Sequence, residues 1–181
     1  VDALGDVRAD GDEHGVEVAE GEVGEICARG PLVMAGYWNK PQETAAALRH
    51  GWLYTGDLAR RDADGYLYIV DRSKDMIISG GFNVYPSEVE QVIWGHPAVQ
   101  DCAVIGVPDE QWGEAVKAVI ELNAGQTVSA EEIIALCKEK LGSVKAPKTV
   151  DFIEQLPRSP AGKVLKKELR AEYWQNTERK I

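Results

Sequence analysis

A run of five polar residues, DRSKD at positions 71–75, interrupts two apolar segments near the middle of the chain. The charge balance also changes there: residues 1–70 carry 6 basic and 13 acidic side chains, and residues 71–181 carry 14 and 17. A polar run between two apolar strands is typical of a linker at a domain boundary. We therefore predict two domains, residues 1–71 and 72–181, rather than one continuous core.

Short β segments dominate the chain before this boundary. Residues 1–30 are broken repeatedly by Gly and Asp, and residues 24–29 alternate between apolar and polar side chains as a strand does. Residues 41–48 predict a short helix, because Pro stands at its start and an alanine run follows. Residues 65–70 predict a further strand, and the Thr-Gly pair before Asp57 predicts a turn at the end of another. The first domain is therefore expected to be a β-rich subdomain.

The second domain mixes strands with helices. Residues 76–84 predict two strands joined by a Gly-Gly turn. The sequences SEVE at 87–90 and SAEE at 129–132 are capping boxes, which predict the starts of two helices ending near Gly95 and Gly142. Further strands and a terminal helix are predicted at residues 103–107, 115–122, 150–153 and 165–173. The expected fold class is α+β, with a short sheet flanked by helices.

Composition excludes several classes of protein. The hydrophobic fraction of 44% and the charged fraction of 28% are ordinary for a globular protein, and no apolar run approaches the length of a membrane span. The net charge of −10 argues against nucleic acid as a partner. The odd cysteine count and the absence of metal-ligand spacing predict buried free thiols, no metal site and a reducing, cytoplasmic location. The three cysteines are Cys27, Cys102 and Cys137.

Four separated segments match the motifs of one family. They are YTGD at 54–57, DRSKDMIISGGFNVYPSEVE at 71–90, GVPDEQWGE at 106–114 and PRSPAGK at 157–163. In this order and spacing the chain resembles the adenylate-forming (AMP-binding) superfamily, which includes acyl-CoA synthetases, carrier-protein adenylation domains and luciferases. The resemblance implies an acid–CoA ligase that uses ATP to form an acyl-adenylate and then transfers the acyl group to the thiol of CoA.

The resemblance implies that Lys163 is the catalytic lysine of the adenylation step. An ammonium is a compact cation suited to anionic oxygens, and Gly162 lets the loop approach a ligand closely. Without the resemblance, Lys163 would be read as a solvated lysine beside Lys166 and Lys167. Some members of the family carry an acetylated lysine at this position, and acetylation would remove the charge that adenylation needs.

Two more residues are assigned to ATP through the resemblance. It implies that Asp57 and Arg72 bind the ATP or AMP ribose, because a carboxylate accepts hydrogen bonds from a diol and a guanidinium donates them. It also places the hinge of the mobile domain at Lys74, where a solvated polar residue can absorb a backbone rotation. The alternative readings are a turn aspartate, a surface ion pair and an exposed turn lysine.

Four residues are assigned to CoA in the same way. The resemblance implies that Gly80, Gly81 and Trp112 line the pantetheine channel and that Lys148 pairs with a CoA phosphate. A simple hairpin turn and a core or rim tryptophan are the alternative readings. Some relatives have a second basic residue where Ala146 stands, and this departure weakens the assignment to the CoA nucleotide.

The superfamily's Gly/Ser/Thr-rich phosphate-binding loop is missing from this sequence. The chain is therefore expected to hold the last β-rich subdomain of the large adenylating domain and the whole mobile domain, with the large domain as its partner. ATP, CoA and a fatty or aromatic acid are the expected substrates, and the ligands of Mg²⁺ are expected elsewhere. A carrier-protein-loading domain, a luciferase-like enzyme and a non-catalytic docking or homodimerisation module remain alternatives.

Overall fold

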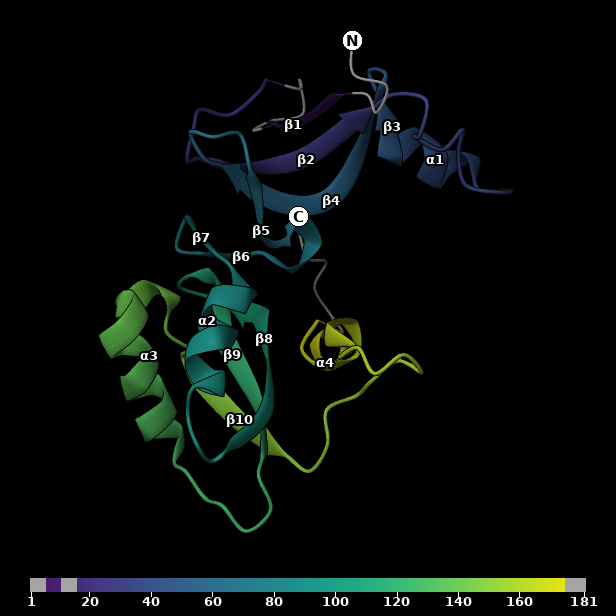
Figure 1. Ribbon diagram of the computed structural model, residues 1–181. Coiled ribbons are helices and arrows are strands. Elements are labelled where there is room, and N and C mark those ends of the chain that lie inside the picture. Colours follow the sequence, from purple (N-terminus) through teal and green to yellow (C-terminus); the bar gives the residue numbers. More distant parts are fainter. Residues whose placement is uncertain (1–5, 11–15, 175–181) are drawn as a thin grey trace. The chain divides into compact units, whose positions relative to one another are not determined.

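The computed structural model describes residues 6–10 and 16–174 of the chain (Figure 1). These residues form two compact units, Val1–Lys74 and Asp75–Ile181, whose division falls inside the polar run of residues 71–75. Each unit has its own sheet. None of the helices in the described part of the chain is long and apolar enough to cross a membrane.

The first unit is built on a five-stranded antiparallel sheet. The strands follow the order β1-β2-β4-β3. Strand β5 also pairs with β4, along residues 57–61, whereas β3 pairs with residues 52–53. The helix α1 (Pro41–Ala47) leads directly into β3, which confirms the helix predicted at residues 41–48. The strands are β1 (Asp6–Asp10), β2 (Val23–Arg29), β3 (Leu48–Arg49), β4 (Trp52–Arg61) and β5 (Leu67–Arg72).

Asp57 does not lie at a strand end, and that prediction was wrong. β4 is ten residues long and includes the whole YTGD motif. Within it, Gly56 has a φ of +76° and the register shifts between Leu58 and Ala59. Strand β2 pairs along one side of β4 and β5 pairs along the other, so the strand persists through a local irregularity that resembles a turn in the sequence. Asp57 therefore projects from the middle of a sheet.

The second unit contains a mixed five-stranded sheet. The strands follow the order β10-β9-β6-β7, and β8 pairs with β9 along most of its length. Only the β9–β10 pair is parallel among the described pairings of this sheet. The strands are β6 (Ile77–Ser79), β7 (Phe82–Val84), β8 (Val99–Asp109), β9 (Gly113–Leu122) and β10 (Thr149–Ile153).

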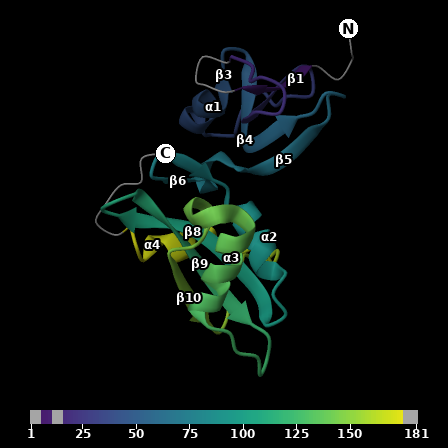
Figure 2. The same cartoon turned by 90° about the vertical axis from the view of Figure 1, so that its left-hand side faces the viewer.

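Alternate residues of β8 enter two cores on opposite faces of this sheet. Cys102 and Val104 pack with residues of α2 (Pro86–Trp94) and α3 (Ala130–Lys145). Ala103 and Ile105 pack instead with Leu156 and with α4 (Lys166–Ala171). Figures 1 and 2 show α3 on one side of the sheet, with α4 on the other in Figure 1. The α+β class with helices flanking a short sheet is confirmed.

One of the two predicted capping boxes has its serine cap, whereas the Glu132 carboxylate of that box lies 3.3 Å from His96 Nε2. The Ser129 hydroxyl accepts a hydrogen bond from the backbone N–H of Glu132 at 3.1 Å, so α3 begins as predicted. Its helical geometry is interrupted at Gly142, where φ is +81° and a helix end was predicted, and a last turn continues to Lys145.

The capping box predicted at residues 87–90 was wrong. α2 begins after Tyr85 without a side-chain cap. Glu90 turns into the protein instead, where one carboxylate oxygen accepts a hydrogen bond from the Val104 N–H at 2.7 Å and lies 2.7 Å from the Lys166 ammonium. These partners come from distant parts of the chain and hold Glu90 in a buried position.

Candidate functional site

Asp57 and Arg72 face each other across two paired strands of the first unit. They are direct partners in the β4–β5 register, and Arg72 Nε lies 3.0 Å from Asp57 Oδ1. Both side chains are partly exposed. The cross-strand ion pair holds a carboxylate and a guanidinium side by side at the surface, where they can accept from and donate to a sugar hydroxyl pair.

Glu25 supports this pair from the neighbouring strand, a role that the sequence interpretation missed. Its carboxylate accepts a hydrogen bond from the Gly56 N–H at 2.7 Å, and the Asp57 N–H donates to the Thr55 hydroxyl at 3.1 Å. Both bonds fix the backbone immediately before the Asp57 side chain. The one signal in the sequence was an acidic residue within the alternating strand at residues 24–29, which is a weak signal.

Lys74 occupies a single 3₁₀ turn, Ser73–Asp75, at the division between the two units. The next residue, Asp75, is held within the second unit, because its Oδ1 lies 2.9 Å from Arg170 Nη2 of α4 and both side chains are largely buried. The contact is an ion pair rather than an aligned hydrogen bond. The second unit is thus anchored from its first residue onward.

The Gly-Gly turn between β6 and β7 packs against Trp112. Gly80 and Gly81 have φ values of +58° and +83°, as a two-residue hairpin turn requires. A Cβ on Gly80 would lie 2.6 Å from the Trp112 ring, whereas a Cβ on Gly81 would meet nothing within 4 Å. The Gly80 N–H also donates to the Trp112 carbonyl at 2.9 Å. Gly80 is therefore a packing residue, and Gly81 faces open space.

Lys148 lies close to the same tryptophan. Its ammonium is 5.7 Å from the Trp112 ring centroid and donates to the Ser143 carbonyl at 2.7 Å. Trp112 is 41% exposed, so part of the ring remains open to a ligand. A narrow pocket of about 160 Å³ opens here, lined by Ser79, Phe82, Trp112, Ser143, Val144 and Lys148. Three of the four residues predicted to contact CoA thus gather at one pocket or its wall, with Gly81 beside them.

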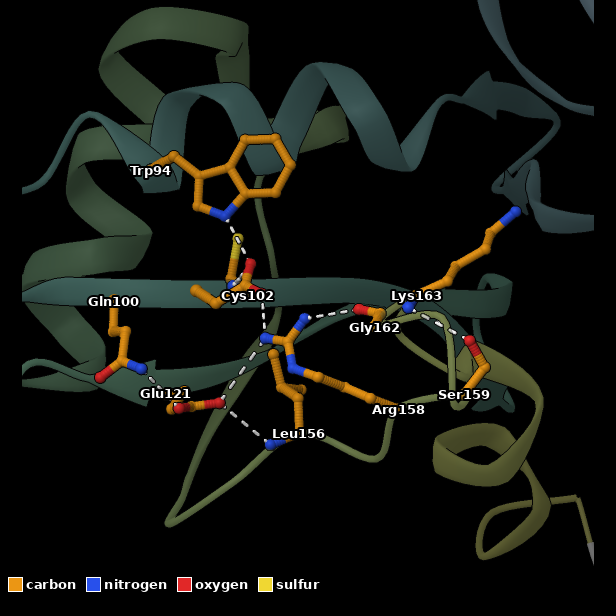
Figure 3. A network of polar contacts seen from close by, with 10 residues as sticks. Trp94, Gln100, Cys102, Glu121, Leu156, Arg158, Ser159, Gly162 and Lys163 are labelled. Carbon is orange, nitrogen blue, oxygen red and sulfur yellow. Dashed lines mark hydrogen bonds and ion pairs between the residues drawn. The ribbon is translucent and has the colours of Figure 1, made fainter.

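Lys163 stands on a tightly closed loop of the second unit. The backbone of Ser159 both accepts from Gly162 and donates to Lys163, each at 2.8 Å, and the Lys163 N–H donates to the Ser159 hydroxyl at 3.2 Å. Gly162 has a φ of +79°, which the tight loop needs. Figure 3 shows the Lys163 side chain pointing away from these bonds, and the residue is exposed. The backbone is fixed while the ammonium stays accessible.

Arg158 connects this loop to the sheet, a role that the sequence interpretation missed although the residue lies in the PRSPAGK motif. Its Nη1 donates to the Gly162 carbonyl at 3.1 Å (Figure 3), and its Nη2 donates to Asp101 Oδ2. Nη2 also lies 3.9 Å from Glu121 Oε2, which accepts from the Leu156 N–H at 3.1 Å. The signal was an arginine five residues before Lys163, but nothing local identifies its partners.

Asp101 is held as a carboxylate by its neighbours. Burial raises its pKa, but hydrogen bonds from Arg158, from the Trp94 indole and from the Cys102 N–H outweigh burial and lower the pKa below its usual value. The same pair raises the pKa of Arg158, chiefly through its hydrogen bond to Asp101. The Asp101–Arg158 contact is therefore fully charged at neutral pH.

The described residues offer no evident thiol or metal chemistry. The three cysteines are free and buried, as predicted, and burial raises the pKa of Cys137 to about 11 and that of Cys102 further. Among residues 6–10 and 16–174, no three His, Cys, Asp or Glu side chains cluster as metal ligands. The candidate chemistry rests on three groups: Asp57 with Arg72, the Trp112 pocket, and the exposed Lys163.

Comparison with known proteins identifies the class to which this arrangement belongs. Residues 88–163 match the family described as AMP-binding enzyme C-terminal domain. Residues 88–163, which fall within the second unit, belong to this family of AMP-binding enzyme C-terminal domains.

Particular relatives narrow the class. The medium/long-chain-fatty-acid–CoA ligase FadD8 of Mycobacterium tuberculosis is 53% identical over 177 residues, which are 94% of this chain and 31% of that protein. A feruloyl-CoA synthase of Amycolatopsis is 49% identical, over 93% of this chain and 34% of its own length. The ATP-bound crystal structure of MatB from Rhodopseudomonas palustris superposes with a TM-score of 0.86 at 40% identity, covering 94% of this chain and 34% of that one. The chain thus spans about a third of the length of the curated relatives it matches.

Proposed function

We propose that this chain acts as the carboxyl-terminal part of an ATP-dependent carboxylic acid–CoA ligase, which forms an acyl-adenylate and then an acyl-CoA. The observation that carries this proposal is the extent of the similarity to proteins named as CoA ligases, which runs through both units rather than through residues 88–163 alone. The remainder of the active site, including the acid pocket and the phosphate-binding loop, would come from a large adenylating domain.

In the adenylation step, Lys163 would stabilise charge. A carboxylate and the α-phosphate of ATP are both anionic, so their reaction requires a cation at the transition state. The exposed ammonium on a fixed loop supports this role for Lys163. Asp57 and Arg72 would hold the ribose, and their cross-strand pairing keeps both groups in place before ATP binds. Mg²⁺ would accompany the ATP phosphates and supply further positive charge there, with its ligands outside this chain.

In the second step, the Trp112 pocket would admit the thiol arm of CoA. The pocket is narrow, its wall is largely apolar, and the open side of Gly81 allows an extended chain to pass. Lys148 would pair with a CoA phosphate at the rim. The pocket includes the end of α3, whereas the Lys163 loop packs with the opposite face of the sheet. If the two steps use different faces, the domain of residues 72–181 must rotate relative to residues 1–71. We assign the hinge of this rotation to Lys74.

The acid is proposed to be a fatty or an aromatic acid, because the relatives include both a fatty-acid–CoA ligase and a feruloyl-CoA synthase. The buried free thiols fit a reducing, cytoplasmic setting. A role in fatty-acid metabolism belongs to the proposal on the strength of the relative that is 53% identical.

The test is an assay of the full-length ligase with ATP, CoA and a panel of fatty and aromatic acids. We expect acyl-CoA by mass spectrometry, with AMP and pyrophosphate as the other products. Acyl transfer to a carrier protein but not to CoA would favour the carrier-loading alternative. No activation of any acid, together with a stable homodimer, would favour the non-catalytic module.

A further inference from the structure

The loop that carries Lys163 is fastened on both of its flanks, to helix α2 on one and to strand β8 on the other. Residues 158 and 164 form an isolated antiparallel bridge, so the loop is a small closed hairpin. On its far side, the Lys166 ammonium lies 2.7 Å from the buried carboxylate of Glu90. On its near side, Arg158 reaches Asp101 at the start of β8. These anchors come from α2 and β8, and they are distant from the loop in sequence.

Arg158 joins the sheet to Gly162, the residue before Lys163. Its two terminal nitrogens donate to different acceptors, Asp101 on the sheet and the Gly162 carbonyl in the loop. The planar guanidinium holds two N–H-bearing nitrogens in a rigid fork that serves the two acceptors separately, whereas a lysine ammonium is one compact group on a flexible stem. Asp101 is itself held by the Trp94 indole at 2.9 Å and the Cys102 N–H at 2.8 Å.

We propose that Arg158 is a positioning residue for adenylation: it holds the Gly162–Lys163 backbone against Asp101, so that the Lys163 ammonium is presented in one orientation. The inference rests on the proposed adenylation role of Lys163. A displacement of about 1 Å at a reacting group can reduce a rate by about two orders of magnitude. Arg158 therefore acts through Lys163 without touching the substrate.

Two substitutions test the Asp101–Arg158–Gly162 contact, which we call the clamp. Arg158→Lys keeps the charge and loses the bridge. Asp101→Asn keeps one oxygen as acceptor for Trp94 and Cys102, while its amide replaces the oxygen that faces Arg158. Lys138→Ala, an exposed cation on α3, is the matched control.

The first readout is hydrogen exchange of the chain itself. Both clamp variants are expected to exchange the Gly162 and Lys163 amides about tenfold faster, whereas amides in the middle of β8 stay protected and Lys138→Ala changes neither set. Unchanged loop exchange in both clamp variants would overturn the proposal, since the loop would then be held without Arg158.

The second readout is the adenylation half-reaction of the full-length ligase. We expect Arg158→Lys to lower kcat by about tenfold or more, with the KM for ATP nearly unchanged. In a Lys163→Ala background the same substitution is expected to have no further effect, because the two residues act as one unit. A further loss in that background would indicate a general structural role and contradict the proposal.

The outcomes also separate this inference from the proposed function. If Lys163→Ala abolishes adenylation while Arg158→Lys and Asp101→Asn behave as wild type, the positioning role is wrong and the ligase assignment stands. If Lys163→Ala leaves adenylation intact, the roles of Lys163 and of Arg158 are both contradicted and the ligase assignment stands. If the unsubstituted full-length protein forms no acyl-adenylate, the proposed function itself is contradicted.

Discussion

Gly80 and Gly81 stand side by side in one turn but have different surroundings. Both have positive φ, so alanine at either position costs about 1–2 kcal/mol of backbone strain. At Gly80 the new methyl would also lie 2.6 Å from the Trp112 ring, whereas at Gly81 it would meet open space. We predict that Gly80→Ala lowers the free energy of unfolding by about 1–3 kcal/mol more than Gly81→Ala does. Urea denaturation of both variants checks this, and equal losses would contradict the packing role of Gly80.

Asp101 gives the second unit a defined acid sensitivity. Its pKa in the folded protein lies below the ordinary 3.8, so its contribution to stability is present above that value and is lost as pH falls through the folded pKa. We predict that Asp101→Asn destabilises the chain by about 1–3 kcal/mol at pH 7. The difference from wild type should shrink as the pH is lowered from 4 to about 2.

Denaturation at a series of pH values measures this difference, with Glu154→Gln as the control at an exposed carboxylate of the same unit. A destabilisation by Asp101→Asn that is constant from neutral to acid pH would show that the ionised carboxylate is not what stabilises the loop.

At the level of elements, α3 depends on its amino-terminal cap. The Ser129 hydroxyl satisfies the Glu132 N–H at 3.1 Å, one of the donors that a helix start leaves without a partner. We predict that Ser129→Ala lowers the free energy of unfolding by about 1 kcal/mol and that Ser129→Asp does not, because aspartate keeps the acceptor. Thermal unfolding followed by circular dichroism distinguishes the two, and equal effects would rule out the cap.

Local sequence patterns predicted the elements whose causes are local. The Gly-Gly hairpin, the Ser129 cap and the short helix at residues 41–48 each depend on neighbouring residues, and each is present. The SEVE segment had the same local pattern as the Ser129 cap, but Glu90 is drawn inward by Val104 and Lys166. No window of the sequence around Glu90 contains either partner, so the error could not be detected locally.

The residues of the candidate site also fall into those that the sequence could predict and those that it could not. Motif resemblance supplied Lys163, Asp57 and Trp112, because those residues stand at fixed places within short motifs. It did not supply Arg158 or Glu25, whose roles depend on contacts between segments that are distant in sequence. The sequence thus predicts the groups proposed to touch substrates better than the groups that hold them in place.

At the level of the whole molecule, the chain has two units joined at Lys74–Asp75. Asp75 belongs to the second unit through its contact with Arg170, so any pivot is confined to the residues immediately before it. On the proposed function, neither unit contains the phosphate-binding loop or the acid pocket. We therefore predict that the 181-residue chain alone releases no pyrophosphate from ATP with any acid of the panel. Release above the background of a Lys163→Ala chain would contradict this division of the active site.

The most direct measurement compares the two half-reactions of the full-length ligase carrying Lys163→Ala, with Lys167→Ala as a control at a nearby exposed lysine. The proposed mechanism predicts that Lys163→Ala lowers the rate of acyl-adenylate formation by about two to three orders of magnitude, because a cation is removed from the transition state. Transfer of the acyl group from preformed acyl-adenylate to CoA should remain within a few fold of wild type, and Lys167→Ala should leave both steps intact. An equal loss in both half-reactions, or an adenylation rate unaffected by Lys163→Ala, would contradict the central claim that Lys163 serves the first step alone.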